Sequence, residues 1–286
     1  MFAVAVLVAV GVPSAVAWRA YAAEVAVFFP RTPPLLLPMG KANIGGLRQV
    51  TIPTRIIEVS AWYAPSTNGA TLIFCHGAGG DRFQLIAEAR TLAREGFGIL
   101  LFDWPGHGNT GGRVTWGTPE QEMFTGIVDW LVAEQSPRKH ALGAIGFSLG
   151  GYVLTQVAVA DPRVRAMALI GTPSNLNDQV RLAHQRWRLI RETSARWALR
   201  NNGLDLDGPQ PAQVIARFAP RPVLVVGGTK DTTVPLELTE QLFRAARQPK
   251  QLWLIDGAGH GQQVAAGGDA YLGRLVEHFR EALLQP

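Results

Sequence analysis

From residue 48 to the C-terminus, short runs rich in β-branched residues alternate with longer segments of helical periodicity. This alternation is typical of strand–helix–strand crossover units and predicts a mostly parallel sheet with helices on both faces. We expect eight strands, the first two paired antiparallel, at 49–52, 56–63, 71–75, 98–102, 142–147, 167–170, 223–226 and 251–255. Helices are expected at 83–95, 120–134, 149–159, 236–247 and 271–284. The chain is therefore predicted to be an α/β protein with an eight-stranded, mostly parallel sheet.

Composition excludes several other classes of protein. Of 286 residues, 47% are hydrophobic and 17% charged, which allows a sizeable core and excludes a disordered chain. Cys75 is the only cysteine, so an internal disulfide is excluded, and no Cys/His spacing suggests a metal site. The net charge of +5 equals that of residues 181–200, where six arginines face only Glu192. Because nucleic-acid binders spread basic and aromatic residues along a groove, no nucleic-acid partner is expected.

A serine nucleophile is predicted where the fifth strand runs into the next helix. The sequence there is Gly146-Phe147-Ser148-Leu149-Gly150-Gly151. A sharp strand-to-helix turn holds the central serine in a strained backbone conformation, and Gly146 and Gly150 avoid collisions with neighbouring backbone. The flanking strand and helix make the G-x-S-x-G pattern specific. We interpret Ser148 as a nucleophile presented at the end of the sheet.

The partners that a serine nucleophile needs follow later in the chain. An imidazole must take the serine proton, and a carboxylate must orient the imidazole. Asp231 lies in the loop after the strand at 223–226, and His260 lies in a glycine-rich loop after the strand at 251–255. Asp256 is the rival carboxylate, but it lies only four residues before His260 on the same loop. We therefore predict a Ser148–Asp231–His260 triad.

Acyl transfer also needs donors aimed at the developing oxyanion. The N–H of Leu149, directly after the nucleophile, is one candidate. The second is the N–H of Ala78, in the glycine-rich loop His76-Gly77-Ala78-Gly79-Gly80 after the third strand. His76 and Gly77 are expected to support this loop.

The remaining acidic and histidine residues are expected to play structural roles. Asp103 opens the turn Asp103-Trp104-Pro105-Gly106-His107-Gly108, and its carboxylate is expected to tie that turn together with His107. We expect His140, His184 and His278 to be solvated.

Across roughly residues 48 to 284 the chain resembles the α/β-hydrolase superfamily, in particular its serine esterase, lipase and serine-aminopeptidase-like branch. The resemblance rests on HGAGG at 76–80, DWPGHG at 103–108, GFSLGG at 146–151 and the loops of Asp231 and His260. It implies the α/β-hydrolase fold and serine hydrolysis without a cofactor, with the roles assigned above. It also implies that the insertion at about 172–211 is a short helical cap over the active site.

The cap contains the arginine-rich stretch 181–200, which also carries apolar residues such as Leu189 and Trp197. A solvated basic helix is one interpretation. The other is a helix that lies on an anionic membrane surface or meets a negatively charged substrate.

The N-terminal segment is apolar, since residues 1–18 contain no charged side chain. Eighteen helical residues reach about 27 Å, just short of the hydrocarbon core of a bilayer. Three interpretations stay open: a transmembrane anchor, a cleaved signal peptide that ends at Ala17 or Ala22, and an apolar helix packed on the folded domain. We divide the chain into an apolar segment at 1–30, a proline-rich linker at 31–47 and a hydrolase domain at 48–286. We expect membrane association, with export after signal cleavage as the alternative.

The expected function is a serine hydrolase that cleaves small carboxylic esters or thioesters through an acyl-Ser148 intermediate, with His260 as general base and then general acid. A peptidase or amidase with the same triad is one alternative. A non-catalytic binding protein with the same fold is the other, because fold alone does not fix function.

Overall fold

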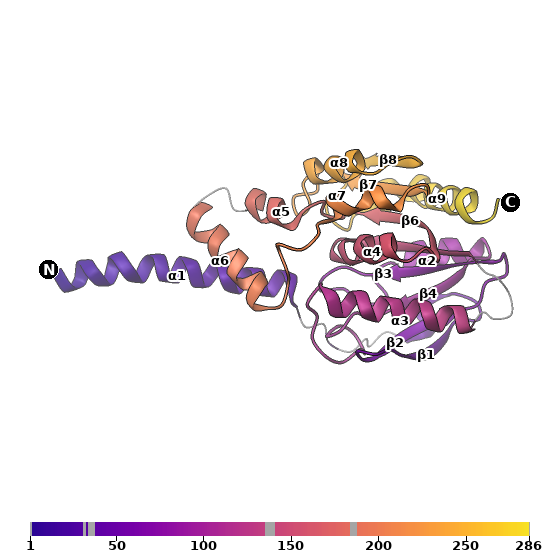
Figure 1. The fold of residues 1–286 in the computed structure, drawn as a ribbon, viewed down its shortest axis with the longest axis horizontal. Helices are drawn as coiled ribbons and strands as arrows, with labels where there is room; N and C mark the ends of the chain where they lie inside the picture. Colours follow the sequence, from indigo (N-terminus) through magenta and orange to yellow (C-terminus); the bar gives the residue numbers. More distant parts are fainter. Residues whose placement is uncertain (1, 31–32, 34–37, 135–140, 184–187, 286) are drawn as a thin grey trace.

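The computed structural model describes residues 2–30, 33, 38–134, 141–183 and 188–285, with side chains from residue 14 onward except at 183 and 188. In this part of the chain eight strands form one sheet in the order β1-β2-β4-β3-β5-β6-β7-β8. The α/β-hydrolase fold predicted from the sequence is thereby confirmed (Figure 1). The strands are β1 (Arg48–Pro53), β2 (Glu58–Ala64), β3 (Ala70–Cys75), β4 (Gly98–Phe102), β5 (Ala141–Phe147), β6 (Val164–Ile170), β7 (Val223–Gly228) and β8 (Lys250–Ile255).

The register of the parallel strands places the loops of the site beside one another. β1–β2 and β2–β4 pair antiparallel, and all other neighbours pair parallel. Cys75 at the end of β3 lies opposite Gly146 in β5, and Phe147 lies opposite Ile170 in β6. The loops that leave these strands, and those after β7 and β8, therefore meet at one edge of the sheet, where ligands bind in open α/β sheets.

Helices cover both faces of the sheet and bury an apolar cluster on each. On one face lie α3 (Thr118–Glu134), α4 (Leu149–Ala160) and α8 (Leu236–Ala245), whose residues Met123, Val153 and Leu242 share a buried cluster. On the other lie α2 (Ile86–Arg94) and α9 (Gln263–Leu283), which contribute Ala89 and Leu275. Strands such as β3, β4 and β5 are buried along their whole length. Burial on both faces explains why these strands read as continuous apolar runs.

Some helix boundaries differ from the sequence prediction because side chains form local turns. α2 begins at Ile86 and not at residue 83, since the Asp81 carboxylate accepts the N–H of Phe83 and closes a turn before the helix. Gly96 ends the helix with a φ of +85°, the left-handed conformation that favours glycine. α9 begins earlier than predicted, at Gln263, and is kinked at Gly268.

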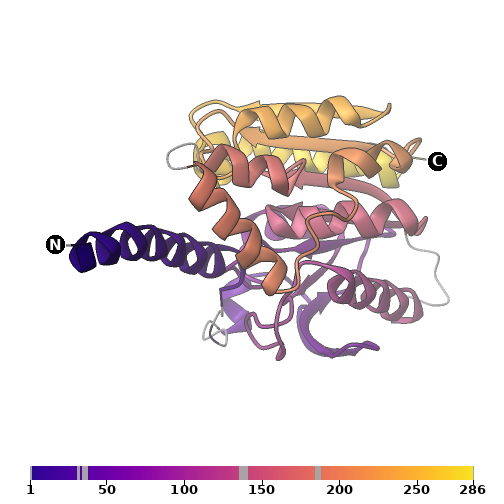
Figure 2. The same ribbon diagram turned by 60° about the vertical axis from the view of Figure 1, so that its left-hand side comes forward.

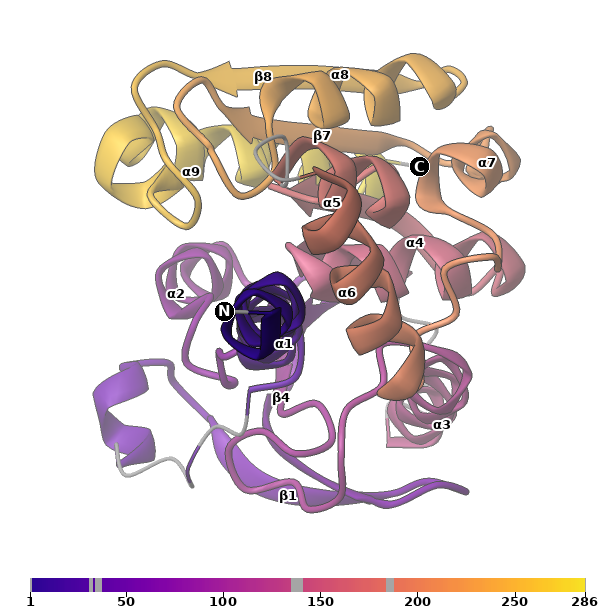
Figure 3. The same cartoon turned by 90° about the vertical axis from the view of Figure 1, so that its left-hand side faces the viewer.

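The cap follows β6 and consists of α5 (Leu176–Ala183), α6 (Arg188–Asn201) and α7 (Pro211–Val214). A long N-terminal helix, α1 (Phe2–Phe28), projects from the domain, and α6 crosses its C-terminal half (Figures 1 and 2). Figure 3, viewed along α1, shows the two helices side by side at the end of the sheet where α2 and α4 begin. Most of the proline-rich linker lies outside the described residues, and the short helix η1 (Met39–Ala42) precedes β1.

The C-terminal end of α1 is buried against the rest of the protein. Ala20, Phe28 and Phe29 are at most 9% exposed, and the two phenylalanines join the apolar cluster on the α3–α4 face. The indole N–H of Trp116 donates to the carbonyl oxygen of Phe28. The sequence analysis considers a membrane span at residues 1–18, but among the residues that the structure describes no helix is long and apolar enough to cross a membrane.

Candidate active site

Ser148 sits on the turn between β5 and α4 in a conformation that few non-glycine residues adopt, with φ +52° and ψ −125°. The glycines around it are required by close backbone packing. A Cβ on Gly146 would lie 2.4 Å from the Cα of Gly151, and one on Gly150 would lie 2.2 Å from the carbonyl oxygen of His76. Both contacts are with backbone and cannot relax cheaply. The sequence therefore folds into a turn that holds the serine hydroxyl at the edge of the sheet.

The structure brings the three predicted triad residues together. His260 Nε2 lies 3.0 Å from Ser148 Oγ, and His260 Nδ1 lies 2.7 Å from Asp231 Oδ2. The other carboxylate oxygen, Oδ1, accepts the N–H groups of Thr233 and Val234 at 2.9 and 2.8 Å. The Asp231 side chain is 1% exposed and that of His260 20% exposed, so the imidazole is the more accessible member of the pair. This geometry allows the imidazole to accept the serine proton while the carboxylate fixes its orientation.

Asp256, the rival carboxylate, lies away from the imidazole. Its Oδ1 accepts the hydroxyl of Thr229 at 3.0 Å, and the residue is exposed. The ring of Phe147 instead flanks His260, with ring centroids 4.7 Å apart. Asp231 is therefore the carboxylate that reaches His260.

The predicted oxyanion donors lie on the two loops that meet at the sheet edge. Gly77 is so close to the nucleophile that a Cβ there would lie 3.0 Å from the Cβ of Ser148. In the described part of the chain, neither the N–H of Ala78 nor that of Leu149 donates to a protein acceptor. Both donors are thus available to a substrate oxygen.

Gln84 holds the glycine-rich loop, and the sequence analysis missed it. Its Oε1 accepts the N–H of Gly77 at 2.8 Å, which fixes the loop one residue before Ala78. The signal for this role was weak, because Gln84 falls inside the helix predicted from periodicity. Its side chain folds back onto the loop because α2 begins only at Ile86.

His76 supports the site from below, as predicted. It is 2% exposed; its Nε2 accepts the N–H of Trp104 at 3.0 Å, and its Nδ1 donates to the carbonyl oxygen of Gly77 at 2.8 Å. Burial, together with the neighbouring His107, lowers the pKa of His76 to about 3. A neutral imidazole is required here, because Nε2 must accept a hydrogen bond while Nδ1 donates one.

His107 supports the same loop from the next turn. Its Nε2 accepts the N–H of Gly79 at 3.2 Å, and burial lowers its pKa. Its ring lies between those of His76 and Trp116, at centroid distances of 5.1 and 5.6 Å. Trp116 is one of three described non-glycine residues with positive φ. Trp116 contacts both the end of α1, through Phe28, and His107, which supports the glycine-rich loop.

Asp103 ties its turn together as expected, and does so through an arginine that the sequence analysis missed. Its carboxylate accepts the backbone N–H groups of Arg82 and Asn109 at 2.7 and 2.8 Å. It also accepts Nε and Nη2 of Arg82 at 3.0 and 2.5 Å. Both side chains are at most 1% exposed, so this is a buried ion pair beside the glycine-rich loop at 76–80, which we call the oxyanion loop.

The other predicted surface histidines do not all lie on the surface. The prediction for His278 was wrong: it is 3% exposed and its Nε2 donates to the carbonyl oxygen of Met167 at 3.1 Å. Burial lowers its pKa to about 4. The signal was available, since His278 shares a helical face with the buried residues Leu275 and Phe279. His140 lies outside the described residues, and so does His184.

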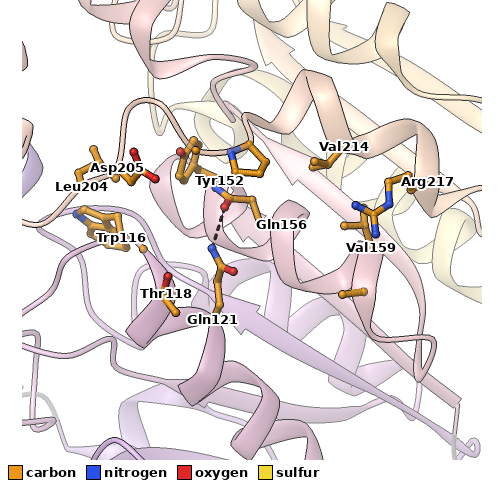
Figure 4. A pocket seen from close by; sticks show the side chains of 14 residues that line it. Trp116, Thr118, Gln121, Tyr152, Gln156, Val159, Leu204, Asp205, Val214 and Arg217 are labelled. Atoms are coloured by element: carbon orange, nitrogen blue, oxygen red, sulfur yellow. Dashed lines mark hydrogen bonds between the residues drawn. The ribbon is translucent and has the colours of Figure 1, made fainter.

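A cavity of about 210 Å³ lies between α3, α4 and the end of the cap, and no triad residue lines it (Figure 4). Tyr152, one helical turn after Ser148, and Trp116 form part of its wall. Within it Gln121 Nε2 donates to Gln156 Oε1 at 2.8 Å. Among the described residues no group of three or more His, Cys, Asp or Glu side chains is placed to hold a metal ion.

Comparison with known proteins finds relatives that share this fold. A family model described as the α/β-hydrolase fold matches residues 70–208. An uncharacterized protein of Mycobacterium tuberculosis is 28% identical over 262 residues, covering 89% of this chain and 86% of the relative. The uncharacterized protein YfhR of Escherichia coli is 26% identical over 243 residues, covering 79% of this chain and 78% of the relative.

Solved structures share the fold at lower identity. An esterase of Pyrococcus furiosus superposes with a TM-score of 0.73 at 20% identity, covering 88% of this chain and 98% of that one. A protein of Xanthomonas campestris, described as an α/β serine hydrolase without a lid, superposes with a TM-score of 0.60 at 20% identity, covering 88% and 99%. The family match over residues 70–208 and the solved structures show that the chain has the α/β-hydrolase fold.

Proposed function

We propose that the protein is a serine hydrolase that cleaves carboxylic esters or thioesters through an acyl-Ser148 intermediate. One observation carries the proposal: Ser148 Oγ, His260 and Asp231 form a continuous hydrogen-bonded chain of 3.0 and 2.7 Å. Ser148 is held at this position by a strained backbone. Such strain persists where the surrounding structure enforces it, and it clusters at active sites.

The proposed reaction begins when His260 Nε2 takes the hydroxyl proton as Ser148 Oγ attacks the carbonyl carbon of the substrate. The carbonyl oxygen becomes an oxyanion, which the N–H groups of Ala78 and Leu149 stabilise. The intermediate then collapses, and the protonated His260 gives its proton to the leaving alcohol or thiol. A water molecule, activated by the same imidazole, attacks the acyl-serine and releases the acid. No cofactor takes part in these steps.

Esters and thioesters are favoured over amides because the leaving group is better and needs less help from the general acid. The structural neighbour from Pyrococcus furiosus is an esterase, which agrees with this preference. A peptidase or amidase would use the same three residues. A non-catalytic protein of this fold would have no need to keep a buried aspartate, an imidazole and a strained serine aligned.

The test is a comparison of leaving groups with one acyl chain. Purified protein is given p-nitrophenyl butyrate, a butyryl thioester and butyryl p-nitroanilide, and Ser148→Ala is assayed in parallel. We expect ester and thioester turnover that the substitution abolishes, and at least about tenfold slower turnover of the anilide. Faster anilide hydrolysis would favour the amidase, and a folded protein that turns over none of the three would favour the binding protein.

A further inference from the structure

Helices α1 and α6, which lie far apart in the sequence, pack together into one unit that we call the α1–α6 platform. The ring of Tyr21 on α1 lies 4.6 Å from that of Trp197 on α6, and Asn201 Nδ2 donates to the Tyr21 hydroxyl at 2.9 Å. Ala20 and Ala198 are buried at the crossing. The two helices are seen side by side in Figures 1 and 3.

The platform carries most of the exposed large hydrophobic side chains in the part of the chain whose side chains the structure describes. Six large hydrophobic residues of the described chain are exposed, and four of them lie on α1 or α6. They are Trp18 (66%), Val27 (56%), Leu189 (79%) and Trp197 (58%). An exposed apolar surface of this kind marks an interaction site. The first 18 residues of the chain, most of which form the outer part of α1, also contain no charged side chain.

Aromatic residues form a band across the platform. Trp18 stacks on Tyr21 at 6.0 Å, and Tyr21 in turn meets Trp197. Rings with one apolar and one polar end are enriched where hydrocarbon meets water. Arg19, the residue after Trp18, is exposed, whereas Glu24 is only 8% exposed and faces the protein. Along α1, the uncharged segment is therefore followed by an aromatic band that contains one exposed cation, an arrangement typical of the boundary of a lipid layer.

The charge of the cap is less available than the sequence analysis supposed. The structure describes the side chains of four of the six arginines in 181–200, and three of these four form ion pairs: Arg181 with Asp178, Arg196 with Glu192 and Arg200 with Asp207. A partner held by charge alone would therefore meet three arginines that already have acidic partners. The positive charge that is left favours an anionic partner, but apolar burial supplies the larger part of the attraction.

The platform is connected directly to the site. The carbonyl oxygen of Phe28 accepts the Trp116 indole, and the ring of Pro30 packs so closely on the oxyanion loop that a Cβ on Gly79 would lie 3.4 Å from its Cγ. Both α1 and α6 lie at the edge of the sheet where Ser148 is presented (Figure 3). A partner bound to the platform would therefore sit beside the mouth of the site.

We propose that the α1–α6 platform binds the surface of an anionic lipid bilayer, with Trp18 and Trp197 in the apolar region. The helix α1 is about 40 Å long, far longer than a site for a pocket-bound ligand needs to be. Resting on the proposed function, the consequence for catalysis is that the substrate is an ester that partitions into the lipid and reaches Ser148 from the bilayer.

The test is sedimentation of the full-length protein with vesicles of phosphatidylcholine alone and of phosphatidylcholine with phosphatidylglycerol. Trp18→Ser combined with Trp197→Ser is expected to weaken the partition coefficient on both vesicles by about tenfold or more. Arg191→Gln is expected to weaken binding only about fivefold, and only on the anionic vesicles. Ile56→Ser combined with Val132→Ser is the matched control, since these are the two exposed large hydrophobics away from the platform (43% and 44%). This control should bind as the wild type does.

Two outcomes would overturn the proposal. One is vesicle binding by the tryptophan variant equal to that of the wild type, with folding of both confirmed by circular dichroism. The other is a wild type that binds no vesicle but forms a dimer in light scattering that the tryptophan variant loses, which would make a second copy of this chain the partner. Ser148→Ala should bind vesicles normally, so failure of the proposed hydrolysis and failure of docking are told apart.

Discussion

Replacing Asp231 with asparagine tests the role of each atom in the triad. Oδ1 of Asp231 accepts two backbone N–H groups, from Thr233 and Val234, so the amide oxygen of the asparagine must occupy that position. The amide NH₂ then faces His260 Nδ1, where the wild type has an accepting oxygen 2.7 Å away. A donor at this place forces the imidazole to carry its proton on Nε2. That tautomer cannot accept the proton of Ser148.

The expected effect of Asp231→Asn is a loss of about 10⁴-fold in kcat for ester hydrolysis, or about 5 kcal/mol of transition-state stabilisation. The substitution keeps the size of the side chain and both backbone hydrogen bonds, so the fold should persist. The assay is steady-state hydrolysis of p-nitrophenyl butyrate, with urea unfolding to check that the variant is native.

Asp256→Asn is the matched control for Asp231→Asn, because Asp256 lies on the loop of His260 but contacts Thr229. It should retain activity within about twofold of the wild type. The reasoning is refuted if Asp231→Asn keeps more than about a tenth of the wild-type kcat, or if Asp256→Asn loses as much as Asp231→Asn does.

Three further substitutions test the support of the site. Asp103→Asn leaves Arg82 buried without its counter-charge and should cost about 3–5 kcal/mol in urea unfolding, whereas a loss below about 1 kcal/mol would show that the pair is not buried in solution. Gly150→Ala places a Cβ 2.2 Å from the backbone of His76 and should abolish activity, and a fully active variant would contradict the tight turn. His278 has its pKa lowered to about 4 by burial, so the unfolded chain binds its proton first and wild-type stability should fall as the pH drops from about 6.5 to 4. His278→Gln should flatten this part of the stability curve, measured as Tm against pH, and an unchanged slope would assign the dependence to other groups.

The sequence predicted the sheet and the candidate triad because both depend on local patterns. Strands buried on both faces read as short apolar runs, and Ser148, Asp231 and His260 each follow such a run directly. In a parallel sheet the carboxyl ends of the strands lie at the same edge, and this does not depend on how the connecting helices pack. The residues that meet at the ends of these strands could therefore be anticipated from the sequence, whereas the order of the strands in the sheet came from the structure.

The contacts that support the site were harder to predict because they join distant parts of the chain. Gln84 meets Gly77 only because α2 starts three residues later than its periodicity suggests. His278 is buried because it lies on the side of α9 that faces the sheet. In the sequence, a polar residue at this position suggested a solvated side chain instead. The packing of α1 on α6 joins Tyr21 to Trp197 across most of the chain. No local pattern records a contact of that kind.

The measurement that tests the central claim most directly is labelling of the purified protein with a fluorophosphonate, read by intact mass and by mapping the modified peptide. Wild type should gain one adduct, located on Ser148, and both Ser148→Ala and His260→Ala should gain none under the same conditions. A folded wild type that stays unlabelled, or an adduct on a residue other than Ser148, would contradict the account of Ser148 as an activated nucleophile.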